Sequence, residues 1–310
     1  MRKKKAKALV LLSGGLDSRL ALVMMKEQLG RENVEALHFI LPFGEGCCSD
    51  RLCVLGFAQK QNVKLRLVDC TAGRLLSEYI RLLRAPKFGR GAALNPCIDC
   101  RIFMFRKTKR ISRDIRADII VTGEVAGERP MSQKKKILIL IERHAGLEGK
   151  ILRPLSAKVL PETDAQKKGL VDRSRLEAIE GRQRRRQMEL AKVFGITYPN
   201  PAGGCLLCEK EFCKKVSPLL KLKRKLDDLD VALVKIGRHF ETGGIVLGKN
   251  KEENEKLRML AEKHRRGIFV IPEQPGPAAL ISKNEYREQA EELIRRYSKH
   301  RITSFRYIRG

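Results

Sequence analysis

The chain from Ala8 to about Pro154 alternates short apolar runs with longer segments of helical periodicity. The apolar runs predict buried strands at 8–12, 34–40, 63–68, 118–122 and 151–155. Apolar residues three or four positions apart predict a helix that starts near Leu20 and further helices at 71–84, 101–113 and 135–144. This alternation predicts an α/β fold with a doubly wound parallel sheet, which binds ligands at the carboxyl ends of its strands.

The pattern changes further along the chain. Residues 161–198 predict helices, 198–205 predict a loop, and a shorter mixture of elements follows Lys225. In this last part we expect strands at 229–236, 244–247, 268–271 and 278–281, a helix capped by Asn250 that runs to His264, and a helix at 284–298. The expected domains are a catalytic domain at 1–160, a helical extension at 161–220, and a smaller α+β domain at 221–310.

The composition points to a polyanionic partner. The 310 residues include 65 Lys and Arg against 36 Asp and Glu, which gives a formal net charge of +29. Such an excess favours nucleic acid, and since Trp is absent, phosphate contacts are expected to outweigh base stacking. The sequence has no apolar run of membrane-spanning length and no signal-peptide pattern, so we expect a cytoplasmic protein without membrane contact.

The segment between the first strand and the first helix predicts an anion-binding loop. Gly14 and Gly15 let the backbone approach phosphate oxygens, and the helix N-terminus offers N–H groups. Ser13 and Ser18 can donate hydroxyl hydrogen bonds, and Asp17 can hold a Mg²⁺ that bridges phosphates. Because no Lys follows the second glycine, the loop is not of the Walker type.

Two further strand ends carry candidate nucleotide contacts. His38 and Phe39 lie near the end of the second strand, and Gly123 and Glu124 follow the fourth. Carboxyl ends of parallel strands meet at one edge of the sheet, so we expect these residues to flank a nucleotide bound on the first loop.

Nine cysteines in a cytoplasmic chain favour metal binding or thiol chemistry over structural disulfides. Cys97 and Cys100 open a predicted helix, whose N-terminus lowers thiol pKa values, and Cys205 lies on a distant glycine-rich loop. Three such thiols could hold a 4Fe–4S cluster with one open iron, bind Zn²⁺ together with Cys208 or Cys213, or carry a persulfide. The vicinal pair Cys47 and Cys48 fits an active-site loop and an ordinary loop equally well, and the sequence leaves its role open.

The motifs resemble those of a known family. SGGLDS at 13–18 resembles the pyrophosphate loop (PP-loop) of ATP pyrophosphatases, and Asn95–Cys100 with Cys205 is similar to the cysteine motifs of tRNA 2-thiouridylases. Further segments resemble tRNA thiolation enzymes, including 4-thiouridine synthetases: 122–124, 129–133, 153–158 and 201–205. The chain differs from 4-thiouridine synthetases in lacking an N-terminal tRNA-binding extension, so tRNA is expected to bind elsewhere.

This resemblance implies an ATP-dependent tRNA sulfurtransferase. ATP with Mg²⁺ would adenylate a uridine carbonyl oxygen, with Asp17 in the catalytic loop, and sulfur would then displace AMP. The resemblance implies a 4Fe–4S cluster on Cys97, Cys100 and Cys205, with sulfide or a persulfide-carrying protein as sulfur donor. Which uridine is modified, which donor delivers sulfur, and whether the chain dimerises are not determined by the sequence.

RNA contacts are expected in two places. The last ninety or so residues resemble the RNA-binding domain of NFACT proteins, notably at Lys235–Phe240 and Gly248–Asn250. Lys235 and Arg238 are the candidate RNA contacts there. The basic helical segment offers a second set, namely Arg182, Arg184, Arg185 and Arg186.

Three other functions share part of this signal. A desulfidase that removes sulfur from RNA would use a cluster but no ATP, and an amidating or lysidine-forming enzyme would use the PP-loop but no cysteines. A nucleotide-sensing RNA-binding protein would need only the C-terminal domain. The intact SGGLDS loop counts against desulfuration and pure binding, and the cysteines count against amidation.

Overall fold

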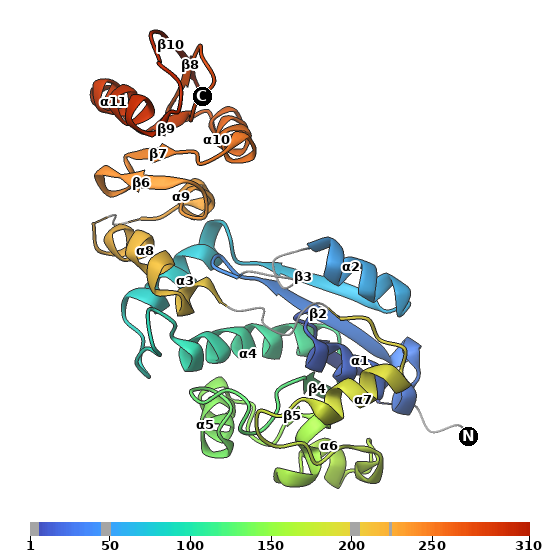
Figure 1. Cartoon of the computed structure of the whole chain (residues 1–310). Helices are drawn as coiled ribbons and strands as arrows, with labels where there is room; N and C mark the ends of the chain where they lie inside the picture. Colours follow the sequence, from blue (N-terminus) through green and yellow to red (C-terminus); the bar gives the residue numbers. More distant parts are fainter. Residues whose placement is uncertain (1–5, 45–50, 199–204, 223–224) are drawn as a thin grey trace. The chain divides into compact units, whose positions relative to one another are not determined.

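The computed structural model describes residues 6–44, 51–198, 205–222 and 225–310, with the backbone alone at 51–53 and 242. The chain forms two compact units (Figure 1). The first comprises Met1–Cys70 and Ala85–Cys208, and the second comprises Thr71–Arg84 and Glu209–Gly310. Each unit has its own five-stranded sheet and its own apolar core.

The sheet of the first unit is parallel and doubly wound, as predicted. Its strands are β1 (Ala8–Leu11), β2 (Val34–Ile40), β3 (Lys64–Asp69), β4 (Ile119–Thr122) and β5 (Ile151–Leu152), in the order β3-β2-β1-β4-β5. The order reverses between β1 and β4, which is where such sheets bind ligands. β5 is shorter than predicted because Pro154, which has no N–H to donate, begins a 3-10 turn over Pro154–Val159.

Helices cover both faces of this sheet. One apolar cluster joins alternate β1 residues, Ala8 and Val10, to α1 (Leu16–Leu29), α2 (Arg51–Lys60) and α7 (Arg185–Val193). A second cluster joins Leu11, on the other face, to α4 (Cys97–Asp114) and α5 (Lys135–Ala145). Alternation along the strand thus divides the core into two layers.

The segment at 161–198 is less helical than predicted. Apart from 3-10 turns, its described residues form only α6 (Asp164–Lys167) and α7. Arg182 and Arg184 therefore precede α7 rather than lying within a helix.

The second unit is α+β, with an antiparallel sheet in the order β10-β8-β9-β7-β6. The strands are β6 (Arg238–Phe240), β7 (Ile245–Leu247), β8 (Ile268–Pro272), β9 (Ala279–Ile281) and β10 (Phe305–Arg309). The helices are α3 (Gly73–Arg84), α8 (Lys210–Leu222), α9 (Asp228–Leu233), α10 (Lys251–His264) and α11 (Arg287–Tyr297). The sequence did not predict β6 or β10; β10 is an edge strand with mostly exposed residues, so it lacks a clear apolar signal.

Two helix starts in this unit show how side-chain caps act. The strand predicted at 229–236 is wrong, because α9 begins there with a capping box. The Asp227 carboxylate accepts a hydrogen bond from Asp230 N at 3.0 Å, and Asp230 accepts one from Asp227 N at 3.2 Å. The cap predicted at Asn250 is confirmed, since Asn250 Oδ1 accepts from Glu253 N at 2.8 Å.

Among the described residues, no helix combines the length and the apolar composition that crossing a membrane requires.

Candidate active site

The loop between β1 and α1 has the strand–turn–helix geometry that the sequence predicts. Gly14 has a φ of +93°, and Gly15 is the extended N-cap residue of α1. The Ser18 hydroxyl organises the turn: it accepts a hydrogen bond from Ser13 N at 3.2 Å and donates one to Gly15 O at 2.9 Å. Among the described residues no side chain caps α1, so its N-terminus is available to an anion.

The end of β4 packs directly against this loop. A Cβ placed on Gly123 would lie 2.5 Å from both Asp17 C and Ser18 N. Only glycine allows this approach, which holds the first turn of α1 against the β4 end. Gly123 thus lies against the loop at 13–18, and its predicted contact with a nucleotide stays a prediction.

Asp17 lies in a polar, largely buried environment that the sequence did not predict. Burial, followed by the negative charge of Glu128, raises the pKa of Asp17 to about 6, while Arg184 and Gln187 lower it in part. Asp17 Oδ1 is buried and has no hydrogen-bond partner among the described residues. Gln187 on α7 is fully buried, and neither of its amide atoms has a hydrogen-bond partner in the described part of the chain.

These residues fit a divalent cation. Mg²⁺ prefers oxygen ligands, keeps several waters, and needs only one or two carboxylates from the protein. The partnerless Oδ1 of Asp17 supplies one ligand, and Glu128 lies near enough to act electrostatically on Asp17. Asp17 is thus the residue that would hold the metal, with Glu128 and Gln187 beside it.

Gln187 could have been found from the sequence by its position. It lies three and four residues before Leu190 and Ala191, and all three are buried on one face of α7. A polar residue on the apolar face of an amphipathic helix either pairs inside the fold or faces a ligand.

Arg184 also has a different environment from the one predicted. Its guanidinium donates to Glu128 Oε1 from Nε at 3.1 Å and from Nη2 at 2.5 Å. Arg186 pairs with Glu177 and Glu189, whereas Arg182 and Arg185 are exposed. Of the predicted RNA contacts in this segment, Arg184 and Arg186 therefore already pair with carboxylates of the protein, whereas Arg182 and Arg185 are exposed.

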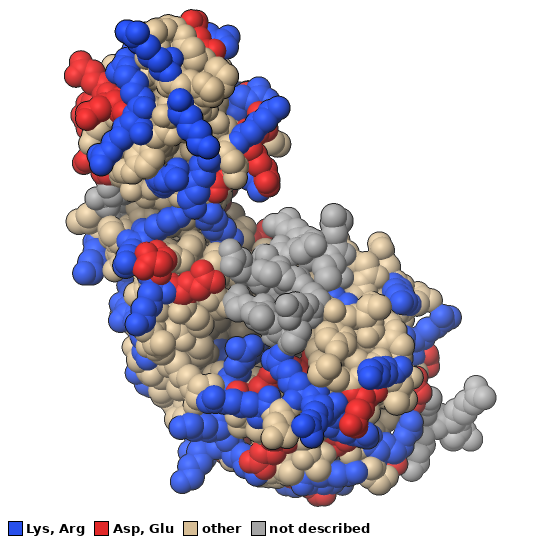
Figure 2. Space-filling view, viewed as in Figure 1, with Lys and Arg blue, Asp and Glu red and all other residues tan. Residues whose placement is uncertain are grey.

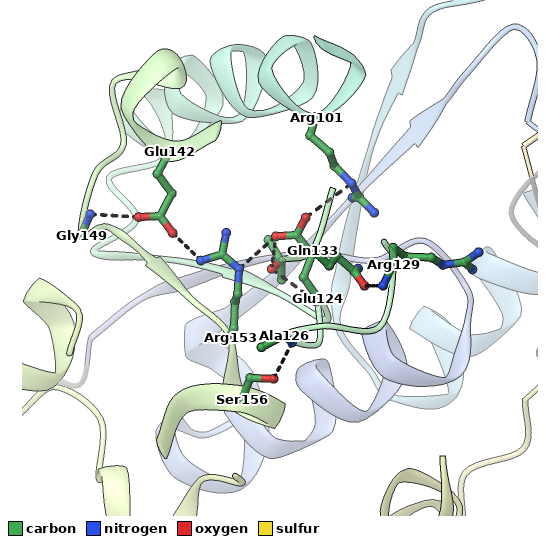
Figure 3. A network of polar contacts seen from close by, with 10 residues as sticks. Arg101, Glu124, Ala126, Arg129, Gln133, Glu142, Gly149, Arg153 and Ser156 are labelled. Atoms are coloured by element: carbon green, nitrogen blue, oxygen red, sulfur yellow. Dashed lines mark hydrogen bonds and ion pairs between the residues drawn. The ribbon is translucent and has the colours of Figure 1, made fainter. Parts of the chain in front are cut away.

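Glu124 is the centre of a buried ion-pair network (Figure 3). Its carboxylate accepts from Arg153 Nε at 3.0 Å, and Arg101 Nε lies 3.4 Å away. Arg153 also pairs with Glu142, which in turn accepts from Gly149 N at 3.0 Å. The predicted nucleotide contact Glu124 is thus already paired with arginines of the protein. Its contact with a nucleotide stays a prediction.

Other motif residues near this network hold the backbone together. Ser156 accepts a hydrogen bond from Ala126 N at 2.9 Å and donates one to Ile179 O at 2.6 Å. Gln133 accepts from Arg129 N at 3.0 Å (Figure 3). Polar residues of the motifs at 129–133 and 153–158 therefore hydrogen-bond the backbone of this region.

The end of β2 contributes a buried histidine. His38 Nδ1 lies 2.8 Å from Leu12 O, the residue that follows β1. Phe39 is half-buried and packs against the cluster around α4 and α5. Both side chains thus fix the strand ends beside the loop, and direct nucleotide contact stays a prediction for them.

Cys97 is the first residue of α4, as predicted, and Asn95 positions it. Asn95 is buried and its Nδ2 donates to Cys97 Sγ at 3.3 Å, while its Oδ1 accepts from Ala93 N at 3.2 Å. Asp99 accepts hydrogen bonds from Lys87 N and Phe88 N. The polar residues of this motif therefore shape the loop that presents the cysteines.

Two sets of backbone contacts bring Cys205 to this region. Leu206 N donates to Phe43 O at 3.1 Å, beyond the end of β2, and Leu94 N donates to Leu207 O at 3.1 Å, near the start of α4. Hydrogen bonding with Cys208, burial and the charge of Cys100 all raise the pKa of the Cys205 thiol. Cys205 and Cys100 are therefore electrostatic neighbours although they lie far apart in the sequence.

Cys97, Cys100 and Cys205 are the candidate metal ligands of this region. In the described ranges, no three His, Cys, Asp or Glu side chains are close enough together to hold a metal ion. The donor set suits a cluster chemically, since all three candidates are thiols, and the cluster on Cys97, Cys100 and Cys205 stays a prediction. Of the other cysteines, Cys208 is exposed and Cys213 is buried, and Cys47 and Cys48 lie outside the described residues.

Comparison with known proteins supplies the family. None of the curated proteins matches the chain. The solved structure of the U34-tRNA thiolase NcsA from Methanococcus maripaludis with its 4Fe–4S cluster is similar, with 18% sequence identity and a TM-score of 0.39 over 71% of this chain and 68% of that one. The family model described as thiamine biosynthesis protein (ThiI) matches residues 4–158, half of the chain. The chain therefore belongs to the ThiI family.

Proposed function

We propose that this protein is an ATP-dependent tRNA sulfurtransferase, which adenylates a uridine carbonyl oxygen and replaces that oxygen with sulfur. The observation that carries the proposal is the loop after β1, where an uncapped helix N-terminus and the partnerless Oδ1 of Asp17 lie together. Membership of the ThiI family and the net charge of +29 also support it.

In the first step, the backbone N–H groups of the loop and the N-terminus of α1 bind the phosphates of ATP. The uridine oxygen attacks the α-phosphorus, the α–β bridging P–O bond breaks, and pyrophosphate leaves. A Mg²⁺ held by Asp17 would neutralise the charge of the departing pyrophosphate. Gly123 keeps the first turn of α1 in place against β4, so that these donors are already oriented when ATP binds.

In the second step, sulfur displaces AMP from the activated carbon. A thiol route would use Cys100 and Cys205, which lie near each other although they are far apart in the sequence. The terminal sulfur of a persulfide on one cysteine attacks the carbon and AMP leaves. The other cysteine then attacks the inner sulfur, which forms a disulfide and leaves the terminal sulfur on the uridine. A thiol reductant restores the pair.

The 4Fe–4S cluster predicted for Cys97, Cys100 and Cys205 is a separate question, and no step above depends on it. Anaerobic purification tests it directly. The sequence predicts a brown protein whose broad absorbance is lost on substitution of any of the three cysteines by Ala. A colourless preparation that transfers sulfur at full rate would overturn the cluster and leave the thiol route.

The main experiment combines the full chain, a tRNA transcript, ATP with Mg²⁺ and a persulfide donor. We expect AMP, pyrophosphate and one thiolated uridine in equal amounts, measured by chromatography and nucleoside mass spectrometry. Thiolated tRNA incubated without ATP provides the control for the opposite reaction. Loss of sulfur in that control, with no ATP turnover in the first reaction, would overturn the proposal in favour of a desulfidase.

A further inference from the structure

The second unit contains a cavity of about 440 Å³ that neither the loop chemistry nor the cysteines use. It lies within that unit and is lined by residues of α8, of β6 and of the segments that follow β6 and β7. Its charged lining residues are mostly basic: Lys214, Lys215, Arg238 and Lys249, against Glu211 and Glu241. A volume of this size is typical of a site for a small ligand or one nucleotide.

One acid of the cavity is paired with a cation, and three of the cavity's cations have no carboxylate partner among the described residues. Glu211 pairs with Lys214 at 2.7 Å, and Glu241 accepts a hydrogen bond from Gln289 Nε2 at 2.8 Å. In the described part of the chain, Lys215, Arg238 and Lys249 have no carboxylate partner. Four lining cations against two lining acids leave the cavity with a net positive charge, which Glu253 near Lys215 and Lys249 offsets in part.

The wall that carries this charge is rigidly held. His239 Nε2 lies 3.1 Å from Leu233 O and 2.9 Å from Ile236 O, so it must carry a proton that it donates to these two carbonyls. The next residue after Ile236, Gly237, has a φ of +65°, and a Cβ there would collide with Leu247 O. Only glycine therefore allows this turn.

Lys215 is attached to the same turn, because its Nζ donates to Gly237 O at 2.9 Å. A lysine ammonium has three N–H groups, so two remain for another acceptor. Burial and the charge of Lys249 lower the pKa of Lys215. Burial also lowers the pKa of His239 to about 4, which keeps this side chain neutral near pH 7. An anion in the cavity would relieve the repulsion between the two lysines.

We propose that this cavity binds a backbone phosphate of tRNA, with Lys215 and Lys249 as its direct ligands and Arg238 at its edge. The assignment rests on the proposed function, which makes tRNA the polyanion that the chain must hold. Arg238 is already ordered, because its guanidinium lies 4.8 Å from the centre of the Tyr297 ring. On the faces seen in Figure 2, Lys and Arg side chains spread widely with smaller groups of acids among them, which suits a nucleic-acid backbone.

Salt-dependent tRNA binding by the full-length chain tests the proposal. The variants are Lys215→Gln and Lys249→Gln, and Lys299→Gln is the matched control, an exposed lysine of the same unit outside the cavity. We expect each cavity variant to weaken binding about tenfold and to reduce the slope of log Kd against log salt by roughly one ion, since each phosphate contact releases condensed counterions. The control should change neither by a comparable amount.

The outcomes distinguish failure of the cavity assignment from failure of the proposed function. If the wild-type chain binds tRNA but all three variants keep its affinity and slope, or all three fall equally, the cavity is not a phosphate site. If the wild-type chain does not bind tRNA, both the cavity assignment and the proposed function fail. Binding of an acidic peptide in place of tRNA, lost in the same variants, would also overturn the RNA assignment. Lys249 is exposed, so Lys249→Gln is informative even if Lys215→Gln unfolds the protein.

Discussion

The two units use charge in different ways. In the first unit, most ion pairs of the described residues join positions more than four apart in the sequence, and several are buried, such as those of Arg153 with Glu124 and Glu142. In the second unit, most pairs lie three or four residues apart on exposed helix faces, such as Lys256 with Glu252 and Arg295 with Glu291. Arg266 with Asp227 is an exception, because it joins distant parts of the second unit.

Charged groups in the first unit mainly stabilise the fold, whereas charged groups in the second unit are more readily available to a ligand. Both partners of a buried ion pair are needed for stability, because removing one leaves the other as an unpaired charge that water cannot solvate. An exposed helical pair contributes little and is easily given up. The first unit therefore holds its strand ends with charges that are already paired, whereas the second can present cations to a polyanion.

Removal of the Asp17 carboxylate should have the largest effect. Asp17→Ala is expected to slow ATP-dependent thiolation by at least about 100-fold, because the orienting group for the metal and the phosphates is lost. Binding of tRNA should stay unchanged, since the residues proposed to bind its phosphate lie in the second unit. The measurement is pyrophosphate release, with Asp114→Asn, an exposed acid on α4, as the control. Full activity of Asp17→Ala would show that the loop has another role.

The buried network should matter next, and for stability. Arg153 is 4% exposed, and Arg153→Met leaves Glu124 and Glu142 without their shared partner, so we expect a loss of about 3–5 kcal/mol in the free energy of unfolding. Arg258→Met in the second unit is the matched control, since Arg258 pairs with Glu255 and Glu262 on the surface of α10. Chemical denaturation measures both. Equal effects of the two variants would remove the contrast between the units.

Asp17 should also show a trade between stability and chemistry. Its pKa in the folded chain, about 6, lies above the ordinary 3.8, so its contribution to stability is full below pH 4 and is lost as the pH rises through 6. Asp17→Asn should therefore be more stable than wild type at pH 7, by up to about 3 kcal/mol, and equal to it at pH 4.

Thermal unfolding between pH 4 and 8 measures this difference. Addition of Mg²⁺ should raise the melting temperature of wild type at pH 7 but not that of Asp17→Asn, because only the carboxylate would hold the metal. A wild-type curve that runs parallel to that of Asp17→Asn over the whole pH range would contradict the environment assigned to Asp17.

The smallest effect is expected at a local contact of the second unit. Asn250→Ala removes the cap of α10 and should cost about 1 kcal/mol of unfolding free energy. Asn250→Asp, which keeps an acceptor for Glu253 N, should restore most of it. Failure of Asp to rescue stability would mean that the loss at this position does not come from the cap.

The features that the sequence determined are those built from neighbouring residues. The turn at Ser13–Ser18 depends on two glycines and on a hydroxyl five residues away, and the cap at Asn250 depends on an N–H three residues away. Strand and helix periodicity likewise repeat over short distances, which is why the parallel sheet was predicted. The missed α9 shows the limit of this reasoning, because a capping box outweighed an apolar run.

The tertiary structure alone decided which distant groups meet. Gln187 lies beside Asp17, Cys205 comes near Cys100 through backbone contacts with Phe43 and Leu94, and the Glu124 carboxylate is held by Arg153. α3 follows β3 of the first unit in the sequence, yet it belongs to the second unit, where Arg84 donates to Leu220 O of α8 at 2.9 Å. Such contacts are not encoded in local spacing, because they depend on how whole layers pack and on which buried polar groups must find partners.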